Sequence, residues 1–413
     1  MRKGLVISMR VGRKYVILVL AVLLLLPAFA FAEEGEAASQ PATDLSDAIV
    51  FEKCGHYNLK DKLIGSKMMV SEDWVPFERF FFSIKPMTDA RWLCIQWTNV
   101  PEEVELQQLD ETGAVLARTD VPEEYDFVWA LEENTVRIAF NTGKHGMSLT
   151  RLALYSEGVL PEPFYHWQYA AGHLDYLVIS THPDDDVLYM GGVVPIYGGE
   201  RGYTGTVVFV TTPNRLRVHE AVLGVRTMGG ETYPLFIGYH DVTDEHMKEH
   251  ANMFLPDAVT LSLVRIFRQQ RPLVVFTHDV NGEYGHWQHK VVSASTVEAC
   301  KLVADESYDP ASAAEFGVWE VKKCYLHLYA EDPLVLDVNA PLVSFGGKSA
   351  LEVAREAFLK HGSQQTGRFR VQADWDPYPI SRLGMAYGTV EAGTDAFDNI
   401  DPQLLVSALS NDP

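Results

Sequence analysis

Short runs of apolar residues, separated by segments with helical spacing, dominate the chain from about residue 172. Leu174–Ser180 (LDYLVIS), Gly205–Thr211 (GTVVFVT) and Pro272–Thr277 (PLVVFT) are runs of this kind. Runs without regular polar alternation are typical of strands buried on both faces, as in parallel sheets. Further strands are expected at Pro234–Tyr239 and Lys322–Tyr329. This feature predicts an α/β fold.

Helices are predicted between these strands, where apolar residues recur every three or four positions. The expected helices are Leu216–Met228, Ala258–Gln270, about 286–304, and Ser349–Leu359. Regular alternation of strand and helix favours a doubly wound, mostly parallel sheet. In such sheets ligands bind beyond the carboxyl ends of the strands, so we expect the functional residues there.

The segment from 46 to 158 has a different pattern, with short strands and no long helical period. Expected strands are Arg79–Ile84, Trp92–Trp97, Val104–Gln108 and Val136–Phe140, separated by glycine, proline and acidic residues. This pattern predicts a small all-β sandwich that precedes the α/β domain as an accessory domain. Pro161-Glu162-Pro163 marks the expected boundary, and the α/β domain is expected to cover 165–400.

The first 32 residues have the pattern of a secretory signal peptide. Five basic residues by position 14 precede the apolar run Tyr15–Leu26, and Ala30-Phe31-Ala32 provides a small-x-small cleavage site before Glu33. The alternative is an uncleaved membrane anchor. We expect cleavage, no stable anchor afterwards, and a secreted or extracytoplasmic protein in the periplasm or at the cell surface. Residues 33–45 are acidic, small and proline-containing, which indicates a linker.

The charge of the chain disfavours nucleic-acid binding. The formal net charge is −22, and loss of the basic leader would make the mature chain more acidic. A surface of this sign repels a polyanion.

The four cysteines form no CxxC pair and therefore match neither a zinc finger nor a redox motif. In an exported protein Cys54–Cys94 and Cys300–Cys324 are conceivable disulfides, and buried free thiols are the alternative.

Two segments rich in metal-binding groups follow predicted strands. Thr181–Asp186 (THPDDD) follows LDYLVIS, and His278–His289 (HDVNGEYGHWQH) follows PLVVFT. A hydrolytic zinc site needs three histidine or carboxylate ligands and an open position for water. His182 with one neighbouring aspartate supplies two ligands, and either His286 or His289 supplies the third.

The adjacent aspartates are expected to divide two roles. Neighbouring side chains point in different directions, so Asp184 and Asp185 are not expected to bind the same ion. One can bind the metal while the other acts as general base toward a water molecule. This arrangement is typical of a metal-dependent hydrolase.

These segments also resemble motifs of a known family. THPDDD resembles the (A)HPDD(E) motif of the N-acetylglucosaminyl-phosphatidylinositol de-N-acetylase family, also called PIG-L or LmbE-like, and Tyr284–His289 resembles its Y-G-H-x-x-H element. Arg217 and Glu220 match a weaker R-x-x-E element, and His361–Gln364 is similar to a late H-x-S-Q. The ordered set covers roughly 172–370 and leaves the first 150 residues unmatched.

The resemblance implies a Rossmann-like fold, a zinc cofactor and removal of acetyl groups from GlcNAc-type substrates. By position it implies three groups of site residues. The first group is the zinc ligands His182, Asp185 and His289. The second is the catalytic residues: Asp184 as general base, His286 as the group that stabilises or protonates the tetrahedral intermediate, and Tyr284 near the oxyanion. The third is the substrate contacts Arg217 and Asp241.

The chain departs from the family pattern at two places. Asp186 replaces the usual glutamate, and Trp287-Gln288 replaces the common Pro-Asp between the two histidines. Neither change removes a catalytic group. The sequence therefore predicts zinc-dependent hydrolysis of the N-acetyl group of a GlcNAc-type sugar or glycoconjugate, with release of acetate. The alternatives are a metal-dependent amidase for another exported N-acyl glycan and a non-catalytic carbohydrate-binding protein.

Overall fold

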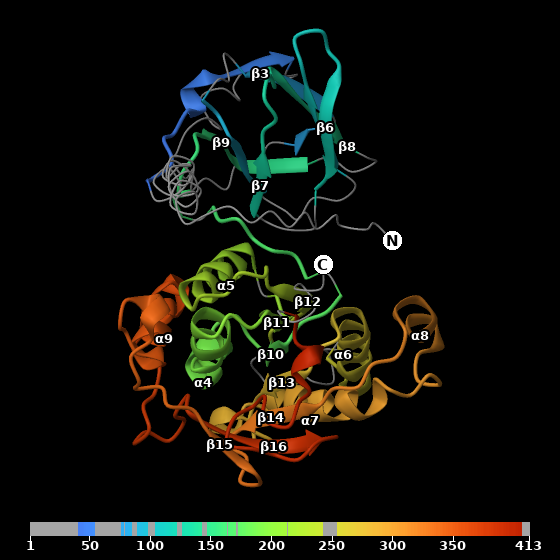
Figure 1. Cartoon of the computed structure of the whole chain (residues 1–413), viewed down its shortest axis with the longest axis vertical. Coiled ribbons are helices and arrows are strands. Elements are labelled where there is room, and N and C mark those ends of the chain that lie inside the picture. The colour runs from blue at the N-terminus through green and yellow to red at the C-terminus, as the bar shows by residue number, and fades with distance from the viewer. Residues whose placement is uncertain are drawn as a thin grey trace, which may run out of the picture. The chain divides into compact units, whose positions relative to one another are not determined.

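The computed structural model describes most of the chain, and it divides into two compact units (Figure 1). The units are Met1–Tyr165 and His166–Pro413. The described residues are 40–53, 76–77, 79–84, 89–97, 104–121, 126–142, 147–162, 164–170, 172–212, 214–242 and 254–406. The predicted signal peptide lies outside them, as do residues 33–39 of the predicted linker. None of the helices in these ranges is long and apolar enough to cross a membrane.

The described part of the first unit consists of antiparallel strands in two sheets. One sheet has the order β1-β3-β8-β5-β6 and the other the order β2-β9-β4-β7. Besides the short 3-10 helix η1 (Ser46–Ala48), the elements are β1 (Ile49–Lys53), β2 (Pro76–Phe77), β3 (Arg79–Ile84), β4 (Trp92–Trp97), β5 (Val104–Leu109), β6 (Val115–Asp120), β7 (Asp126–Ala130), β8 (Arg137–Thr142) and β9 (Met147–Tyr155).

Side chains from both sheets share one apolar core. Ile95 and Trp97 of β4 pack in the same cluster as Leu106 of β5 and Phe140 of β8, and all four are fully buried. Strands occur at all four places where the sequence predicts them. The sandwich over 46–158 as a whole stays a prediction, because several of its segments lie outside the described residues.

The second unit contains a seven-stranded sheet in the order β12-β11-β10-β13-β14-β16-β15. The first five strands are parallel, and the last two pair antiparallel. The strands are β10 (Tyr176–Ser180), β11 (Gly205–Thr211), β12 (Leu235–Tyr239), β13 (Val274–Thr277), β14 (Lys323–His327), β15 (Pro333–Val335) and β16 (Arg382–Gly388). The fold class is therefore α/β with a mostly parallel sheet.

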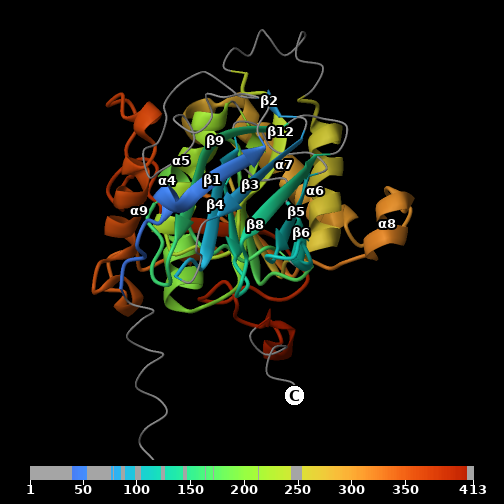
Figure 2. The same ribbon diagram turned by 90° about the horizontal axis from the view of Figure 1, so that it is seen from above.

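Helices cover both faces of this sheet (Figures 1 and 2). Helices α4, α5 and α9 lie on one side, and α6 and α7 on the other, with α8 beyond α6. The helices are α4 (Asp185–Met190), the π-helix η2 (Val194–Glu200), α5 (Arg215–Thr227), α6 (Pro256–Gln270), η4 (Glu283–Gly285), α7 (Trp287–Leu302), α8 (Pro310–Phe316), η5 (Val343–Phe345), α9 (Ala350–Leu359), η6 (Gly362–Gln364) and η7 (Pro402–Leu404).

Burial explains why these segments form a three-layer structure. All seven residues of β11 are buried, as expected for a central parallel strand with helices on both faces. On one face Leu263 and Phe267 of α6 pack with Ile179 and Val275 of the sheet in one cluster. Leu263 and Phe267 are four residues apart and thus lie on the same side of the helix.

The predicted strands and helices of this unit agree with the structure to within two residues at most boundaries. The sequence did not predict the antiparallel edge formed by β15 and β16, nor helix α8. Strand β16 (RLGMAYG) contains two glycines and no clean alternation, and a Cβ at Gly384 would lie 2.2 Å from the Tyr329 carbonyl oxygen. Gly384 therefore allows the two backbones to approach closely, and a glycine at this position weakens the strand pattern in the sequence.

The disulfides considered from the sequence are not formed. Cys94, Cys300 and Cys324 are free and buried. Burial, with a smaller contribution from a thiol hydrogen bond between Cys300 of α7 and Cys324 of β14, raises the pKa of Cys300 well above its usual value. Cys54 lies outside the described residues. The alternative interpretation, buried thiols that pack in the core, holds for the three described cysteines.

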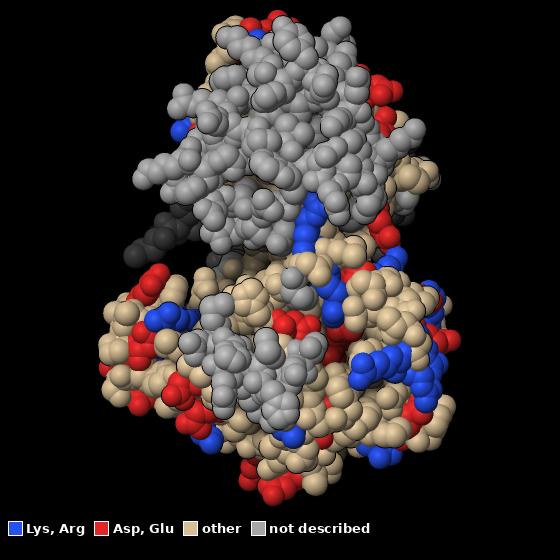
Figure 3. Space-filling view, turned by 180° about the vertical axis from the view of Figure 1, so that it is seen from behind, with Lys and Arg blue, Asp and Glu red and all other residues tan. Residues whose placement is uncertain are grey.

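Acidic and basic side chains are interspersed on the face of the second unit drawn in Figure 3. The excess of acidic residues in the chain therefore does not form one continuous acidic patch on that face.

Candidate metal and active site

The two motif segments meet where the strand order reverses. Strand β10 lies between β11 and β13, and the THPDDD segment follows β10 while the His278–His289 segment follows β13. Sheets of this kind bind ligands at the carboxyl ends of the strands beside such a reversal. The sequence expectation that both segments reach the same edge therefore matches the sheet order.

A tight turn after β10 presents the first motif. The backbone N–H groups of Asp184 and Asp185 both donate to the His182 carbonyl oxygen, and the Ser180 hydroxyl donates to the same oxygen at 2.8 Å. Asp184 has a φ of 150° and precedes helix α4, which begins at Asp185. Positive φ in a residue other than glycine is strained, and such strain concentrates at functional sites.

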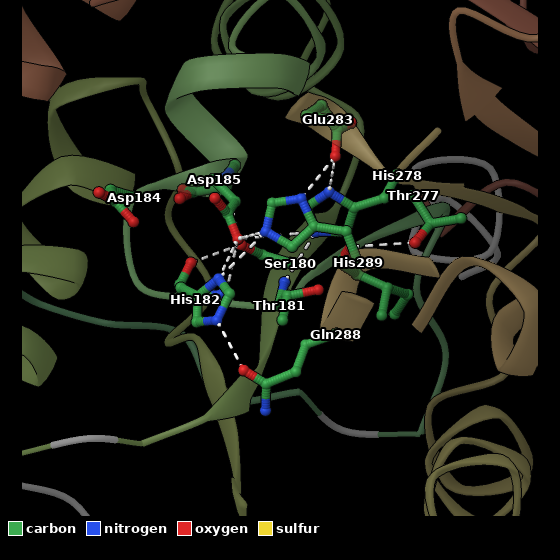
Figure 4. A network of polar contacts seen from close by, with 12 residues as sticks. Ser180, Thr181, His182, Asp184, Asp185, Thr277, His278, Glu283, Gln288 and His289 are labelled. Carbon is green, nitrogen blue, oxygen red and sulfur yellow. Dashed lines mark hydrogen bonds and ion pairs between the residues drawn. The ribbon is translucent and has the colours of Figure 1, made fainter. Parts of the chain in front are cut away.

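Three of the predicted ligands bring their donor atoms together (Figure 4). His182 Nδ1 lies 2.8 Å from Asp185 Oδ2, and His289 Nε2 lies 3.1 Å from the same oxygen. The two nitrogens are 3.2 Å apart. A tetrahedral zinc ion with bonds of about 2.0–2.1 Å separates its ligand atoms by about 3.3 Å, so only a small outward movement would accommodate it.

The electrostatics of these three groups favour bound positive charge. Burial disfavours charged histidine, but the Asp185 carboxylate raises the pKa of His182 to about 10 and that of His289 to about 9. The same two histidines hold the pKa of Asp185 well below its usual value, against its burial. The site thus draws in cations, either protons on the rings or a metal ion. Two nitrogens and one oxygen fit zinc.

Two other groupings of possible ligands occur within the described residues, and hydrogen bonding separates them. One is Asp185, His278 and His289, and the other is His182, His286 and His289. His278 is not free to bind metal, because its Nε2 accepts the Thr181 N–H at 2.9 Å and its Nδ1 contacts a carboxylate at 2.8 Å. His286 is not blocked in this way, so it remains an alternative third ligand.

The second aspartate of the pair has a different environment. Asp184 Oδ1 accepts a hydrogen bond from Arg217 Nη2 at 2.8 Å, and Arg217 also donates to the Pro183 carbonyl oxygen. Burial and the neighbouring Asp185 raise the pKa of Asp184 to about 7, although Arg217 opposes this shift. A carboxyl group with a pKa near neutrality is suited to general base catalysis, and a dication beside it would keep it ionised.

The remaining predicted residues surround the same place. The ring of His286 lies 4.9 Å from that of His182 and 4.6 Å from that of His289, between centroids. Its Nδ1 is buried without a hydrogen-bond partner among the described residues, and burial lowers its pKa to about 4. Tyr284 is 44% exposed and has a φ of 45°, which is rare for a bulky residue. Its ring lies 5.6 Å from that of His286.

Both predicted substrate contacts engage the site itself. Arg217 pairs with Asp184, and Asp241 Oδ1 lies 3.4 Å from His182 Nε2. Each also lines the pocket described next, so a role toward substrate stays a prediction for both.

A pocket of about 300 Å³ opens onto this cluster. Its lining includes Asp184, Tyr284 and His286, together with Arg368 and Phe369, which the sequence did not single out. A larger cavity of about 470 Å³ lies at the opposite ends of the strands, near Gly205. Its described lining contains no histidine, so the smaller pocket is the one with hydrolytic chemistry.

Several supporting residues were not assigned a role from the sequence. Gln288 Oε1 accepts from His182 Nε2 at 3.1 Å and from the Val242 N–H, so Gln288 orients a ligand. Glu283 contacts three histidines, and these hold its pKa well below the usual range despite burial. No sequence pattern marks either residue for this role, because both lie inside the motif segment and act only through other residues.

The weaker motif elements also meet in space. Glu220 accepts hydrogen bonds from the backbone N–H and hydroxyl of Ser363, both at 2.6 Å. Arg217 and Glu220 are three residues apart on α5, so they lie on one face of the helix. This face joins the turn that carries Asp184 to the segment that begins at His361.

Comparison with known proteins identifies the family of this region. The family model GlcNAc-PI de-N-acetylase (PIG-L) matches residues 177–300. A 1D-myo-inositol 2-acetamido-2-deoxy-alpha-D-glucopyranoside deacetylase of Catenulispora acidiphila is 27% identical over 192 residues, which are 40% of this chain and 58% of the relative. The enzyme of that name from Rhodococcus jostii is 25% identical and matches over 36% of this chain and 59% of its own.

The matches have limited extent. The chain spans less than two thirds of the length of these curated relatives. Among solved structures, N,N'-diacetylchitobiose deacetylase from Pyrococcus horikoshii is 18% identical, with a TM-score of 0.39, and the match covers 56% of this chain and 87% of that one. Residues 177–300 thus match the PIG-L (GlcNAc-PI de-N-acetylase) family model, and this range contains both the THPDDD segment and Tyr284–His289.

Proposed function

We propose that this protein is an exported, zinc-dependent N-deacetylase that removes acetate from a GlcNAc-type sugar or glycoconjugate. One observation carries the proposal: three ligand atoms lie within 3.2 Å of one another, and a carboxylate is held beside them by an arginine. A metal site next to a separate base is the minimum that hydrolysis of an amide requires. The named deacetylase relatives support the reaction and the class of substrate.

The ligand set supports zinc. His182 and His289 offer nitrogen and Asp185 offers oxygen, a combination found in catalytic zinc sites with one position left for water. Iron or cobalt can occupy similar sets. When bound, the ion would supply a Lewis acid that activates water and polarises the acetamide carbonyl.

The protein's own groups would perform the proton transfers. Asp184 accepts a proton from the attacking water, and the salt bridge with Arg217 holds its carboxylate at the pocket wall. His286 and Tyr284 line the pocket where the oxyanion develops and can donate hydrogen bonds to it. The nitrogen of the amide leaves with the proton that Asp184 took from the water, because the lowered pKa of His286, about 4, leaves that ring neutral near pH 7. The products are acetate and a free amino sugar.

The pocket supports a sugar as substrate. A volume of about 300 Å³ is at the small end of ligand sites. The rings of Tyr284 and Phe369 lie 5.8 Å apart at this pocket, and aromatic rings provide apolar contact for a sugar face. We infer that one sugar residue with its acetamido group enters at a time.

Export is proposed from the basic, apolar and small-residue pattern of the first 32 residues. It would place the activity in the periplasm, at the cell surface or outside the cell, where glycans and glycoconjugates are available.

Acetate release from a panel of N-acetylated sugars and glycans tests the proposal. Purified mature protein with zinc should release acetate from at least one GlcNAc-type substrate, and Asp184→Asn should release it about 10²–10⁴-fold more slowly. Zinc binding without acetate release from any substrate would favour a non-catalytic carbohydrate-binding protein. Release from other N-acyl glycans alone would favour the alternative amidase.

A further inference from the structure

Glu283 is fully buried at the start of η4 and receives four hydrogen bonds. Its Oε2 lies 2.8 Å from Nδ1 of His278 and 2.7 Å from Nδ1 of His289. Its Oε1 lies 2.8 Å from Nδ1 of His327 and 3.1 Å from the backbone nitrogen of Asp279. Figure 4 shows Glu283 facing the rings of His278 and His289, on the side away from His182. Each carboxylate oxygen thus has two donors, and the network includes one predicted metal ligand.

The tautomer of His278 follows from its contacts. The Thr181 N–H can only donate, and it donates to Nε2 of His278 at 2.9 Å. Nε2 therefore carries the lone pair and Nδ1 carries the proton, which is donated to Glu283. Through this chain of bonds Glu283 also reaches the backbone of Thr181, the residue before the ligand His182.

The contacts of His289 are arranged in the same sense. Its Nδ1 faces Glu283, while its Nε2 faces His182 Nδ1 at 3.2 Å and Asp185 Oδ2 at 3.1 Å. A proton on Nδ1 leaves the Nε2 lone pair directed at the place where the three ligand atoms meet. The reverse tautomer would direct an N–H there and prevent binding.

We propose that Glu283 is the positioning residue of the metal site: it holds the proton of His289 on Nδ1 and, through His278 and Thr181, ties the His182 turn to the same carboxylate. Glu283 touches neither the metal nor the substrate, and it acts only through these neighbours. The inference rests on the proposed function in one respect, that His182, Asp185 and His289 hold the ion. Partners of this type that hydrogen-bond to metal ligands typically change metal affinity by about 10–100-fold when they are replaced.

The third histidine fixes the carboxylate from the opposite side. His327 ends β14, and its Nε2 lies 3.1 Å from the Pro379 carbonyl oxygen while its Nδ1 contacts Glu283. The carboxylate is therefore held by groups from the segment after β13, from α7 and from β14, and His327 is itself fixed by the Pro379 carbonyl. Rotation of Glu283 would break several of these bonds together, which keeps Oε2 in place against both Nδ1 atoms.

Glu283→Gln provides the test, because it preserves the shape while replacing one acceptor oxygen with an NH₂ group. An NH₂ group cannot accept a ring N–H, so one histidine must lose its bond or change its tautomer. With Zn²⁺ as the probe and a chelating dye as competitor, the Kd of the full chain should rise by about 10–100-fold. An unchanged Kd in a folded Glu283→Gln protein would overturn the inference.

A matched control separates positioning from loss of stability. Asp175 is as deeply buried as Glu283, and it precedes the first residue of β10, at the end of the strand away from the site. Its carboxylate accepts hydrogen bonds from the backbone N–H groups of Thr204 and Val406. Asp175→Asn should lower the melting temperature without changing the Kd for zinc. An equal rise of the Kd in Asp175→Asn and Glu283→Gln would show that the effect is general destabilisation, and would overturn the inference.

A measurement on the unmodified protein keeps the test decisive if Glu283→Gln does not fold. In ¹H–¹⁵N spectra of the metal-free protein above about pH 10, where the His289 ring with its pKa of about 9 is neutral, His278 and His289 should both show a proton on Nδ1 and none on Nε2. Absence of that proton on His289 would overturn the inference. Failure of the unmodified protein to bind zinc would instead refute the metal chemistry of the proposed function, and the spectra would still decide the position of the proton.

Discussion

Asp184→Asn is the sharpest test of the proposed division between the two neighbouring aspartates. The asparagine keeps Oδ1, which accepts from Arg217 at 2.8 Å, so the turn before α4 should keep its shape. What is lost is the negative charge and the ability to take a proton. Loss of a general base costs about 10²–10⁴ in rate, which corresponds to about 2.7–5.4 kcal/mol in the activation barrier. We expect kcat to fall in that range.

The metal should respond differently to the two substitutions. Asp184 contacts Arg217, whereas Asp185 Oδ2 lies 2.8 Å from Nδ1 of His182 and 3.1 Å from Nε2 of His289. Asp184→Asn should therefore keep one zinc per chain, and Asp185→Asn should weaken zinc binding because a neutral amide replaces an anionic ligand. Zinc content by elemental analysis and kcat from acetate release, measured on the same samples, separate the two effects.

Asp186→Asn is the matched control within the same motif. Asp186 is 1% exposed, burial raises its pKa well above the usual value, and its two oxygens have no hydrogen-bond partner among the described residues. Asparagine keeps the shape of this side chain, so we expect little effect on zinc content or kcat. The reasoning is refuted if Asp184→Asn loses its zinc while Asp185→Asn keeps its zinc and has a low kcat. If Asp184→Asn and Asp185→Asn both keep zinc and full activity, the active site lies elsewhere.

Further predictions concern the metal, the accessory unit, processing and stability. His289→Ala should lose most bound zinc and all turnover, and one full zinc equivalent in that protein would make His286 the third ligand. The fragment 161–413 should bind zinc and cleave small N-acetyl sugars but lose activity on polymers; if it cannot fold, the first unit is structural. Mass spectrometry of the natural protein should find Glu33 at the N-terminus, whereas Met1 would rule out cleavage. Arg268 is fully buried and donates to four backbone carbonyls and Ser312, so Arg268→Met should reduce the free energy of unfolding by about 3 kcal/mol or more in urea titrations, with the zinc Kd unchanged.

Sequence patterns predicted the parts of the site that lie close together along the chain. Apolar runs located β10 and β13, and the rule on strand ends then placed His182 and His289 at one edge of the sheet. Local geometry also separated Asp184 from Asp185, because successive side chains point in different directions. These inferences needed only the period of each element and the polarity of the residues that follow it.

The supporting groups could not be predicted in this way, because they come together only through the tertiary fold. His327 is a single histidine at the end of β14, and the carbonyl of Pro379 that it contacts lies 52 residues further along the chain. Nothing in the sequence around either residue marks this pairing. The pairing of Arg217 with Asp184 was likewise not predicted, because the family resemblance had assigned Arg217 to the substrate. Strand β16 was missed because two glycines weaken its pattern, and β15 because it has only three residues.

The departure from the family pattern at Trp287-Gln288 can now be given a physical account. Each of the two histidines predicted as ligands has one ring nitrogen directed at the place where the three predicted ligand atoms meet, and the other held by an acceptor from the protein. For His289 that acceptor is the Glu283 carboxylate, and for His182 it is Gln288 Oε1 at 3.1 Å, where the common aspartate would offer a charge. A neutral acceptor polarises the ring less than a carboxylate does, but Asp241 lies 3.4 Å from the same nitrogen and supplies negative charge there. The negative charge beside Nε2 of His182 thus comes from the loop after β12, while Gln288 of α7 provides the neutral acceptor.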